Sequence, residues 1–316
     1  MTKVLITGAN GFVGKALSAA LIAAGFDVTG AVRSAASSSG QIAQIAVGDI
    51  NASTAWQDAL QAVDVVIHLA ARAHVMKETA ADSLGAFRAV NVAGTENLAR
   101  QAAARGVRRF IYLSSIKVNG EHTESAFSIW DEAMPQDPYA LSKWEAEQAL
   151  TKVSLETGLE IVIIRPPLVY GPGVKGNFLR LLKLVNSGCP LPLGRVNNKR
   201  SMVSVNNLCD LIKTCFDHPC ADGQVFLVSD GHDLCTLELV RMMAGHMQRS
   251  IRLLSPPLGW LYGLGKITGK KPEIDRLCKS LQVDIQPTCA TLQWQPPSSV
   301  DEEVKKTVAW FVAQQR

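Results

Sequence analysis

The stretch Gly8-Ala9-Asn10-Gly11-Phe12-Val13-Gly14 decides the fold. It stands directly between a short apolar run, Val4–Thr7, and an amphipathic segment, Phe12–Ala24. A turn with glycine at these positions lets backbone amides approach a pyrophosphate at the N-terminus of a helix. Because the glycines follow a predicted strand and open a predicted helix, they indicate a dinucleotide site. The alternative is a tight turn that binds no ligand.

Strand-like and helix-like segments alternate over residues 1–165. The expected strands are Val4–Thr7, Asp27–Val32, Gln41–Val47, Val63–Leu69, Arg108–Ser114 and Glu160–Arg165, and the expected helices are Phe12–Ala24, Ala81–Arg105 and Tyr139–Thr157. Runs such as Val65-Val66-Ile67 are continuously apolar, which is typical of strands that helices cover on both faces. The pattern predicts an α/β fold with a doubly wound parallel sheet of the Rossmann type.

After Arg165, prolines and glycines interrupt the sequence at short intervals. This higher frequency of proline and glycine predicts a smaller, irregular α/β lobe for the substrate, packed beside the sheet. We expect residues 1–165 and about 201–230 to form the dinucleotide-binding lobe. Residues from about 166 to 200 and from 231 to 316 would then form the substrate lobe.

Composition excludes several classes of protein. With 316 residues and 47% apolar content the chain can bury a large core, and a net charge of +4 does not favour a nucleic-acid partner. The seven cysteines form no CxxC pair and no cluster with histidine at metal-ligand spacing, so we expect reduced thiols, no metal and a cytoplasmic location. No apolar run is long enough for a transmembrane segment. Contact of Pro257–Ile267 with a membrane surface remains the alternative.

Tyr139 and Lys143 are the first candidates for chemistry. They are four residues apart in Pro138-Tyr139-Ala140-Leu141-Ser142-Lys143, so a helix would place both on one face. A positive charge beside a phenol favours the phenolate, which suits an acid/base catalyst. Tyr262 and Lys266 repeat the spacing, but the glycines between them and the prolines upstream argue against a helix there.

The end of the second expected strand bears on the cofactor. An acid at this position usually holds the ribose of NAD, but the strand ends in Arg33-Ser34, and a guanidinium suits a 2′-phosphate. The sequence therefore favours NADP(H) over NAD(H), unless Arg33 is a solvated loop charge. Asp49-Ile50 follows the third strand, where a carboxylate can bond the adenine amino group. Leu69-Ala70-Ala71 follows the fourth strand, near the expected cleft.

The chain resembles the extended short-chain dehydrogenase/reductases, in particular the nucleotide-sugar epimerase and reductase group, over essentially its whole length. The motifs that carry the resemblance are Thr7–Gly14, Gly48-Asp49-Ile50, His68–Ala71, Asn91–Thr95, Leu113-Ser114-Ser115, Tyr139–Lys143 and Arg165–Gly173. The resemblance implies that Tyr139 is the acid/base and that Ser115 hydrogen-bonds the reacting oxygen. It implies that Lys143 holds the nicotinamide ribose and lowers the pKa of the phenol.

The glycine loop, the strand ends and the family motifs together define the candidate site. The candidate cofactor-binding residues are Gly8, Asn10, Gly11, Phe12, Val13, Gly14, Arg33, Asp49, Ile50, Leu69, Ala70, Ala71, Tyr139, Lys143 and Pro166. The candidate substrate-binding residues are Ser114, Ser115, Asn177, Arg200, Arg276 and Lys77. Asn177 and Arg200 match family segments that contact the diphosphate of the substrate, whereas Arg276 is equally well a surface charge. Asn119 departs from the family pattern, which has tyrosine there.

Two stretches, Arg72–Lys77 and Ser115–Gly120, are similar to a bacterial surface-polysaccharide subgroup that acts on UDP-N-acetylhexosamine derivatives. In that subgroup His74 and Lys77 would flank the sugar, unless they lie in a loop of solvated charges. The resemblance implies an NADPH-dependent reductase of the C4 ketone of a UDP-4-keto-6-deoxy-N-acetylhexosamine, and Arg33 favours this reading. The main alternative is a UDP-N-acetylhexosamine or UDP-glucose 4-epimerase with bound NAD, because the same three residues serve both reactions. A non-catalytic dinucleotide sensor is a remote alternative. The family also implies a homodimer through the two longest helices.

Overall fold

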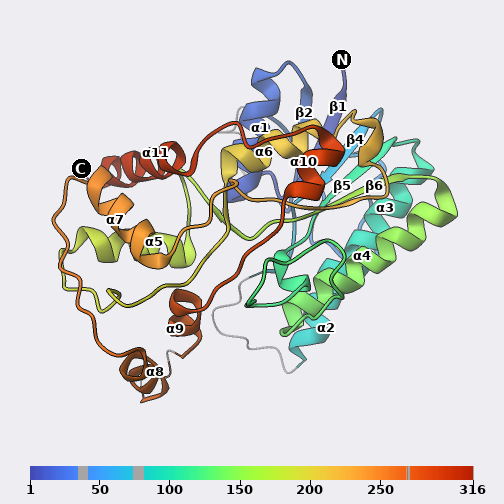
Figure 1. Cartoon of the computed structure of the whole chain (residues 1–316). Helices are drawn as coiled ribbons and strands as arrows, with labels where there is room; N and C mark the ends of the chain where they lie inside the picture. The colour runs from blue at the N-terminus through green and yellow to red at the C-terminus, as the bar shows by residue number, and fades with distance from the viewer. Residues whose placement is uncertain (35–41, 74–81, 268, 270, 316) are drawn as a thin grey trace.

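A parallel sheet of seven strands, in the order β3-β2-β1-β4-β5-β6-β9, forms the centre of the protein (Figure 1). This count refers to the residues that the computed structural model describes, 1–34, 42–73, 82–267, 269 and 271–315. The strands are β1 (Lys3–Thr7), β2 (Asp27–Val32), β3 (Ala43–Ala46), β4 (Val65–His68), β5 (Arg109–Leu113), β6 (Glu160–Arg165) and β9 (Val225–Leu227). The order reverses between β1 and β4, where doubly wound folds bind ligands. The predicted fold class is confirmed.

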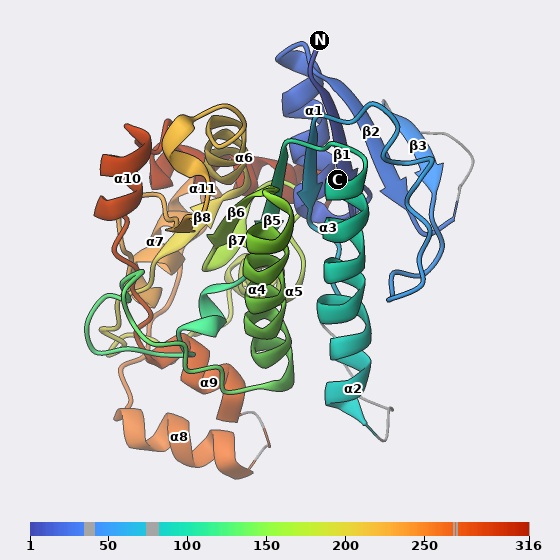
Figure 2. The ribbon, with the colours of Figure 1, turned by 90° about the vertical axis from the view of Figure 1, so that its right-hand side faces the viewer.

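Helices cover both faces of this sheet (Figure 2). They are α1 (Phe12–Ala23) and α6 (Val205–Thr214) on one face, and α3 (Gly94–Ala104) and α4 (Pro138–Thr157) on the other. Consecutive residues of a strand point to opposite faces, so Leu5 packs with α3 and α4 while Ile6 packs with α1 and α6. Burial on both faces explains why the strands are apolar without alternation.

Two expected elements differ in detail. The strand expected at Gln41–Val47 is the shorter β3, and Gln41 lies outside the described residues. The helix expected at Ala81–Arg105 consists of α2 (Ser83–Arg88), a π-helical turn (Ala89–Ala93) and then α3, and its first residue also lies outside the described part. Such π-turns often occur at functional sites.

Helix α4, which carries Tyr139 and Lys143, has strong signals at both ends. The Asp137 carboxylate accepts a hydrogen bond from the backbone N–H of Ala140 at 2.6 Å, and Pro138 follows as the first helical residue. Gly158 ends the helix in the left-handed conformation, with φ of 74°. The two candidate catalytic residues therefore lie in the first two turns of a well-capped helix.

The second half of the chain is mostly helical rather than irregular. Its further elements are β7 (Leu168–Tyr170), β8 (Met202–Ser204), α5 (Gly176–Asn186), α7 (Thr236–His246), α8 (Leu258–Ile267), α9 (Lys271–Cys278), α10 (Gln286–Leu292) and α11 (Val300–Ala313). Tyr262 and Lys266 lie in α8, so the argument against a helix there was wrong. The upstream prolines precede the helix, where they are tolerated, and each interior glycine costs only about 1 kcal/mol.

No helix in the described ranges has both the length and the apolar character that crossing a bilayer requires.

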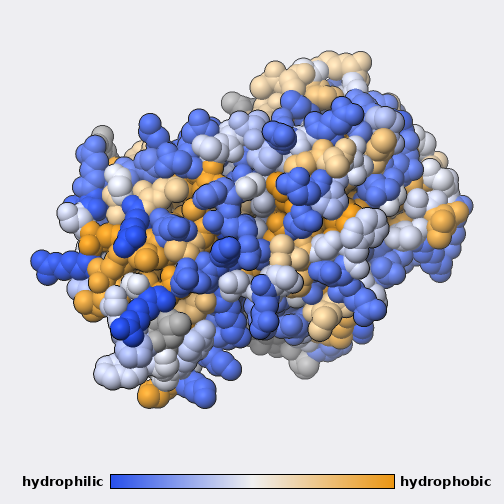
Figure 3. Space-filling model, in the orientation of Figure 1, coloured by the Kyte–Doolittle hydropathy of each residue, from blue (hydrophilic) through white to orange (hydrophobic). Residues whose placement is uncertain are grey.

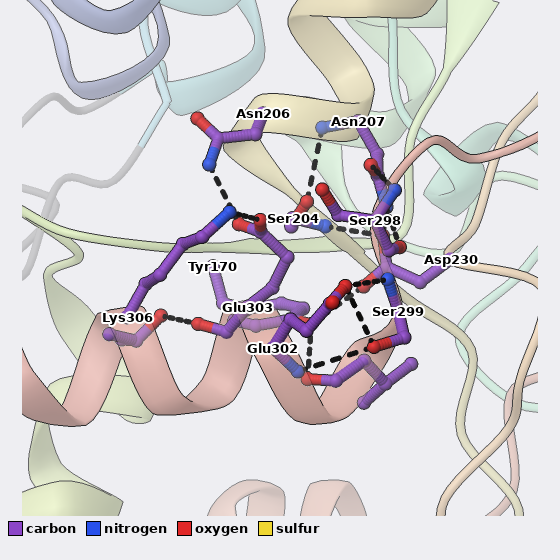
Figure 4. A network of polar contacts seen from close by, with 12 residues as sticks. Tyr170, Ser204, Asn206, Asn207, Asp230, Ser298, Ser299, Glu302, Glu303 and Lys306 are labelled. Atoms are coloured by element: carbon purple, nitrogen blue, oxygen red, sulfur yellow. Dashed lines mark hydrogen bonds and ion pairs between the residues drawn. The ribbon is translucent and has the colours of Figure 1, made fainter.

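A polar network joins β7, β8, α6 and the segment before α11 (Figure 4). The Tyr170 hydroxyl in β7 donates to the Asp230 carboxylate at 2.7 Å, and the same carboxylate accepts bonds from Ser204 N and Asn207 Nδ2. Asn207, in α6, also donates to the carbonyl of Ser298, just before α11. The last helix and the sheet lobe thus meet through groups buried away from water.

Candidate active site

A cavity of about 710 Å³ opens where β1 and β4 end, at the reversal of strand order. It is lined by Gly8, Asn10, Gly11, Ala31, Val32, Arg33, Ser34, Val47, Gly48, Asp49, Ile50, Leu69, Ala70, Ala71, Arg72 and Val90. Most of the cofactor-binding residues expected at the strand ends therefore meet at one place. The predicted cofactor-binding set lacked several lining residues, namely Ala31, Val32, Ser34, Val47, Gly48, Arg72 and Val90. Val90 reaches the cavity from the π-helical turn, for which the sequence carries no clear signal.

The glycine loop leaves room for a ligand to approach the backbone. Gly8 has φ of 69°, and a Cβ atom there would lie 2.9 Å from the backbone nitrogen of Ala70. A Cβ on Gly14 would lie only 2.3 Å from the carbonyl oxygen of Gly8. Side chains would therefore push the loop away from β4 and from α1. This close packing fits a dinucleotide whose phosphates contact the backbone.

Three of the predicted cofactor-binding residues, Phe12, Val13 and Gly14, lie beside the cavity and not in its lining. The side chains of Phe12 and Val13 pack against the apolar core, and none of the three residues lines the cavity. They form the first turn of α1, whose N–H groups have no acceptor within the helix. Any contact of these residues with a phosphate would come from their backbone.

At the adenosine end expected of a dinucleotide, Arg33 and Asp49 form an ion pair of 2.8 Å. Both side chains are largely exposed, at 82% and 77%. The end of β2 has no carboxylate of its own, but Asp49, from the segment after β3, places one beside Arg33. A carboxylate beside Arg33 weakens the argument that this guanidinium is reserved for a 2′-phosphate.

The Ser115 side chain lies close enough to the Tyr139 phenol to influence its pKa. Ser115 follows the end of β5 and caps a short 3₁₀ turn by accepting a bond from Lys117 N at 3.3 Å. The Tyr139 ring packs edge-on against Phe87, with centroids 6.1 Å apart. Burial, followed by the charge of Asp137, raises the pKa of Tyr139 to about 12, while the nearby Ser115 hydroxyl opposes this shift.

Lys143 is buried one helical turn after Tyr139, but its ammonium faces elsewhere. Its Nζ donates to the carbonyl of Leu113 at 2.8 Å and lies 4.5 Å from the centroid of the Tyr112 ring. Burial lowers the pKa of Lys143 to about 7, against the opposing charge of Glu147. In this arrangement the ammonium of Lys143 is directed at Leu113 and Tyr112, and its effect on the pKa of the phenol stays a prediction.

Ser114 does not lie with Ser115, because neighbouring residues of an extended chain point to opposite sides. Its hydroxyl donates to Glu147 at 2.5 Å, and Glu147 forms a buried two-bond ion pair with Arg165. Arg165 also donates to Asn119 at 2.9 Å. Ser114 is therefore buried and engaged by Glu147, and its role as a substrate ligand stays a prediction. The same network occupies Asn119, at the position where the family has tyrosine.

A second buried network ties the ends of β1 and β4 together. His68 lies 2.7 Å from the Thr7 hydroxyl and 2.9 Å from the Thr95 hydroxyl, and the Thr7 oxygen accepts a bond from Ala70 N. Burial, and secondarily the charge of Lys143, lowers the pKa of His68 to about 3. A neutral histidine thus fixes the strand ends under the cavity.

Asn91 and Pro166 brace the loops around the catalytic residues. Asn91, in the π-helical turn, bonds both backbone polar groups of Arg72 and donates to the Ser142 hydroxyl. The carbonyl of Pro166 accepts a bond from Ile116 N at 3.0 Å, which holds the turn after Ser115. Pro166 is buried and does not line the dinucleotide cavity.

The second half of the chain contains a further cavity of about 250 Å³, in which Asn177, Arg200 and Arg276 meet. Arg180 and apolar side chains of α5 and α7 complete it, and Figure 3 shows apolar and strongly hydrophilic residues interspersed over these helices. Burial, and then the nearby charge of Arg276, lowers the pKa of Arg200. Arg276 also borders a cavity that includes Gln136, close to Tyr139 in sequence. Lys77 lies outside the described residues.

Comparison with protein families matches residues 4–229 to the NAD dependent epimerase/dehydratase family. A UDP-glucose 4-epimerase of Vibrio cholerae is 49% identical over 314 residues, which is 98% of this chain and 95% of that protein. An N-acetyl-alpha-D-glucosaminyl-diphospho-ditrans,octacis-undecaprenol 4-epimerase of Escherichia coli O157:H7 is 32% identical, over 92% of this chain and 86% of that protein. A GDP-6-deoxy-D-mannose reductase of Pseudomonas aeruginosa is 29% identical, over 86% of this chain and 92% of that protein.

Solved structures share the fold. A UDP-glucuronic acid 4-epimerase from Bacillus cereus in complex with NAD aligns with a TM-score of 0.80 at 21% identity, and the alignment covers 100% of both chains. RMD from Pseudomonas aeruginosa complexed with NADPH aligns with a TM-score of 0.72 at 22% identity, over 99% of this chain and 100% of that one. At these identities the similarity shows the fold alone.

Proposed function

The chain belongs to the NAD dependent epimerase/dehydratase family, and on this premise we propose that it is a UDP-hexose 4-epimerase that uses NAD. The observation that carries the proposal is the 49% identity to the UDP-glucose 4-epimerase of Vibrio cholerae. That similarity extends over 98% of the chain and therefore over both lobes. We therefore favour the 4-epimerase over the ketoreductase, although the sequence motifs alone favoured the ketoreductase.

The residues around Ser115 can perform the proton transfers that epimerisation at C4 requires. Tyr139 would accept the proton of the 4-hydroxyl as C4 is oxidised and return it when the ketone is reduced on the opposite face. Ser115, whose hydroxyl lies near the Tyr139 phenol, would hold the same oxygen. Lys143 would hold the ribose of the dinucleotide, and its charge would favour the phenolate. When bound, the dinucleotide would supply the hydride acceptor and donor for C4.

The ion pair at the cavity rim supports NAD as the cofactor. Asp49 lies 2.8 Å from Arg33, and its negative charge would repel a 2′-phosphate. An epimerase also has no need to exchange its nicotinamide, because each turnover returns the hydride. The loss of a free Arg33 thus removes the main reason for preferring NADP(H).

The paired arginines of the substrate lobe support a diphosphate substrate. Arg200 and Arg276 line one cavity, and the repulsion between their charges, together with burial, lowers the pKa of Arg200. A diphosphate would neutralise both guanidinium groups and accept bidentate hydrogen bonds from them. Apolar residues of the same cavity would cover a base such as uracil.

A reductase remains the second candidate, since Arg33 lies at the end of β2 and a GDP-6-deoxy-D-mannose reductase is 29% identical. It would reduce a UDP-4-keto-6-deoxy-N-acetylhexosamine with NADPH. The two reactions differ in their demand for reduced cofactor.

The test is an incubation of the purified protein with UDP-glucose and NAD, without any reductant, followed by chromatography of the sugar nucleotides. Formation of UDP-galactose is the expected result, and parallel incubation with UDP-N-acetylglucosamine defines the hexose class. Absence of interconversion in both incubations, together with stoichiometric oxidation of NADPH by the keto sugar, would overturn the epimerase and establish the reductase.

A further inference from the structure

Helix α8 is an apolar element at the margin of the molecule. Its sequence, LGWLYGLGKI, contains Lys266 as its one charged residue. It packs on α9, and Figures 1 and 2 show α8 as the lowest element of the chain, with α9 above it. An apolar helix in this position is short of the neighbours that would cover it.

The two faces of α8 have different surroundings. Tyr262 is half-buried toward α9, and burial followed by the charges of Cys278 and Asp275 raises its pKa. Trp260 and Ile267, seven residues apart and so on one face of the helix, are 75% and 86% exposed. Orange atoms stand beside blue ones at the lower edge of Figure 3, where Figure 1 places α8. A large aromatic and a large aliphatic side chain thus point into solvent together.

Basic residues predominate in the stretch of sequence that contains α8, and the acidic residues Glu273 and Asp275 of α9 follow it. Residues 239–272 contain six lysines or arginines and no aspartate or glutamate, although the whole chain has 32 basic and 28 acidic residues. Lys266 and Lys271 lie on either side of the α8–α9 junction, and both are exposed. Apolar side chains that include tryptophan, flanked by lysine, are what an interfacial helix presents to anionic lipid.

We propose that α8 docks this protein on an anionic lipid surface. Trp260 and Ile267 enter the interface between headgroups and acyl chains, and Lys266 and Lys271 meet the lipid phosphates. Because Arg276 of the neighbouring α9 lines the substrate-lobe cavity, docking places that cavity close to the membrane surface. This property goes beyond the proposed epimerase, which requires no membrane.

Co-sedimentation with lipid vesicles tests the proposal. The full chain is mixed with phosphatidylcholine vesicles that contain phosphatidylglycerol, and separately with pure phosphatidylcholine vesicles, at low and high salt. The test variant is Trp260→Ser with Ile267→Ser. The matched control is Trp130→Ser with Leu155→Ser, which removes a tryptophan that is 82% exposed and a leucine that is 85% exposed elsewhere. Circular dichroism and conversion of soluble UDP-glucose confirm that each variant is folded.

We expect the parent and control proteins to sediment with the anionic vesicles, and the α8 variant to lose about tenfold or more in vesicle binding. Binding should weaken at high salt and on pure phosphatidylcholine. The proposal is overturned if the parent does not bind anionic vesicles at low salt, or if both variants bind equally. It is also overturned if light scattering shows that α8 instead joins two copies, with a dimer that only the α8 variant converts to monomer.

Discussion

At the scale of single residues, the protonation states of Tyr139 and Lys143 govern the proposed chemistry. With its pKa raised to about 12, Tyr139 is protonated at neutral pH and ready to donate, but it must lose a proton before it can act as a base. Lys143, with a pKa lowered to about 7, becomes charged only as the pH falls below that value. A charged Lys143 turned toward the phenol would favour its ionisation, so the two residues act as a unit.

Replacing Tyr139 by phenylalanine should lower the rate of epimerisation by a factor of about 100 to 10,000, the usual contribution of a positioned acid/base. The variant retains the ring that packs on Phe87, so its fold should persist. Steady-state assay with UDP-glucose measures the effect, and Tyr262→Phe in α8 is the matched control. A similar loss in both variants would contradict the assignment of Tyr139.

Replacing Arg33 by alanine distinguishes the two cofactors. If NAD is the cofactor, we expect less than about a fivefold change in activity, because the exposed pair with Asp49 contributes little. Titration of the variant with NAD and with NADP, followed by turnover, measures the preference. A large and selective loss with NADP would instead restore Arg33 as the ligand of a 2′-phosphate.

At the scale of elements, the ends of β1 and β4 are held together by His68. Both ring nitrogens are bonded to threonine hydroxyls, one from β1 and one from α3. Burial, followed by the charge of Lys143, lowers the pKa of His68 to about 3 and so keeps the ring neutral near pH 7. The floor of the dinucleotide cavity is therefore sensitive to acid.

This linkage predicts a pH-dependent stability. The unfolded chain binds a proton at His68 near pH 6.5, whereas the folded protein does so only near pH 3. The contribution of His68 is fully present above pH 6.5 and is lost as the pH falls toward 3, by about 1.4 kcal/mol per pH unit. The free energy of unfolding, measured with denaturant, should fall between pH 7 and pH 5. In His68→Gln this decrease should be about 2 kcal/mol smaller than in the parent protein. Equal losses would show that His68 is not the group responsible.

At the scale of the whole molecule, Asp230 joins elements that are distant in sequence. This carboxylate accepts hydrogen bonds from Tyr170 of β7 and from Ser204 and Asn207, which lead into α6. Burial raises the pKa of Asp230, and its hydrogen bonds oppose the shift. The relative position of the two candidate cavities thus depends on a few buried polar bonds as well as on apolar packing.

Replacing Tyr170 by phenylalanine should reduce the free energy of unfolding by about 1–3 kcal/mol, because a buried carboxylate oxygen loses its donor. Denaturant unfolding measures the change. Tyr262→Phe, which removes a hydroxyl from a half-buried ring, should cost less. If Tyr170→Phe lowers the free energy of unfolding no more than this control does, the network does not contribute to stability.

Local signals explain which parts of the site were predictable. The Gly8–Gly14 loop and the capped helix at Tyr139 depend on neighbours in the sequence, and both form as expected. The direction of the Ser114 side chain could not be predicted, because it depends on Glu147 and Arg165, which are distant in sequence. The α8 helix was missed because propensity argued against it, whereas the fold tolerates its glycines.

By itself, the sequence determined that this protein has a doubly wound sheet with a dinucleotide loop, and that Ser115, Tyr139 and Lys143 are candidates for chemistry. These features follow from periodicity and from residue types at short spacing, which act locally. Only the tertiary structure decided that Asp49 pairs with Arg33, that Lys143 faces Leu113, and which side of β5 Ser114 occupies. Such contacts join residues from different strands and helices, so they exist only once the sheet has brought those elements together.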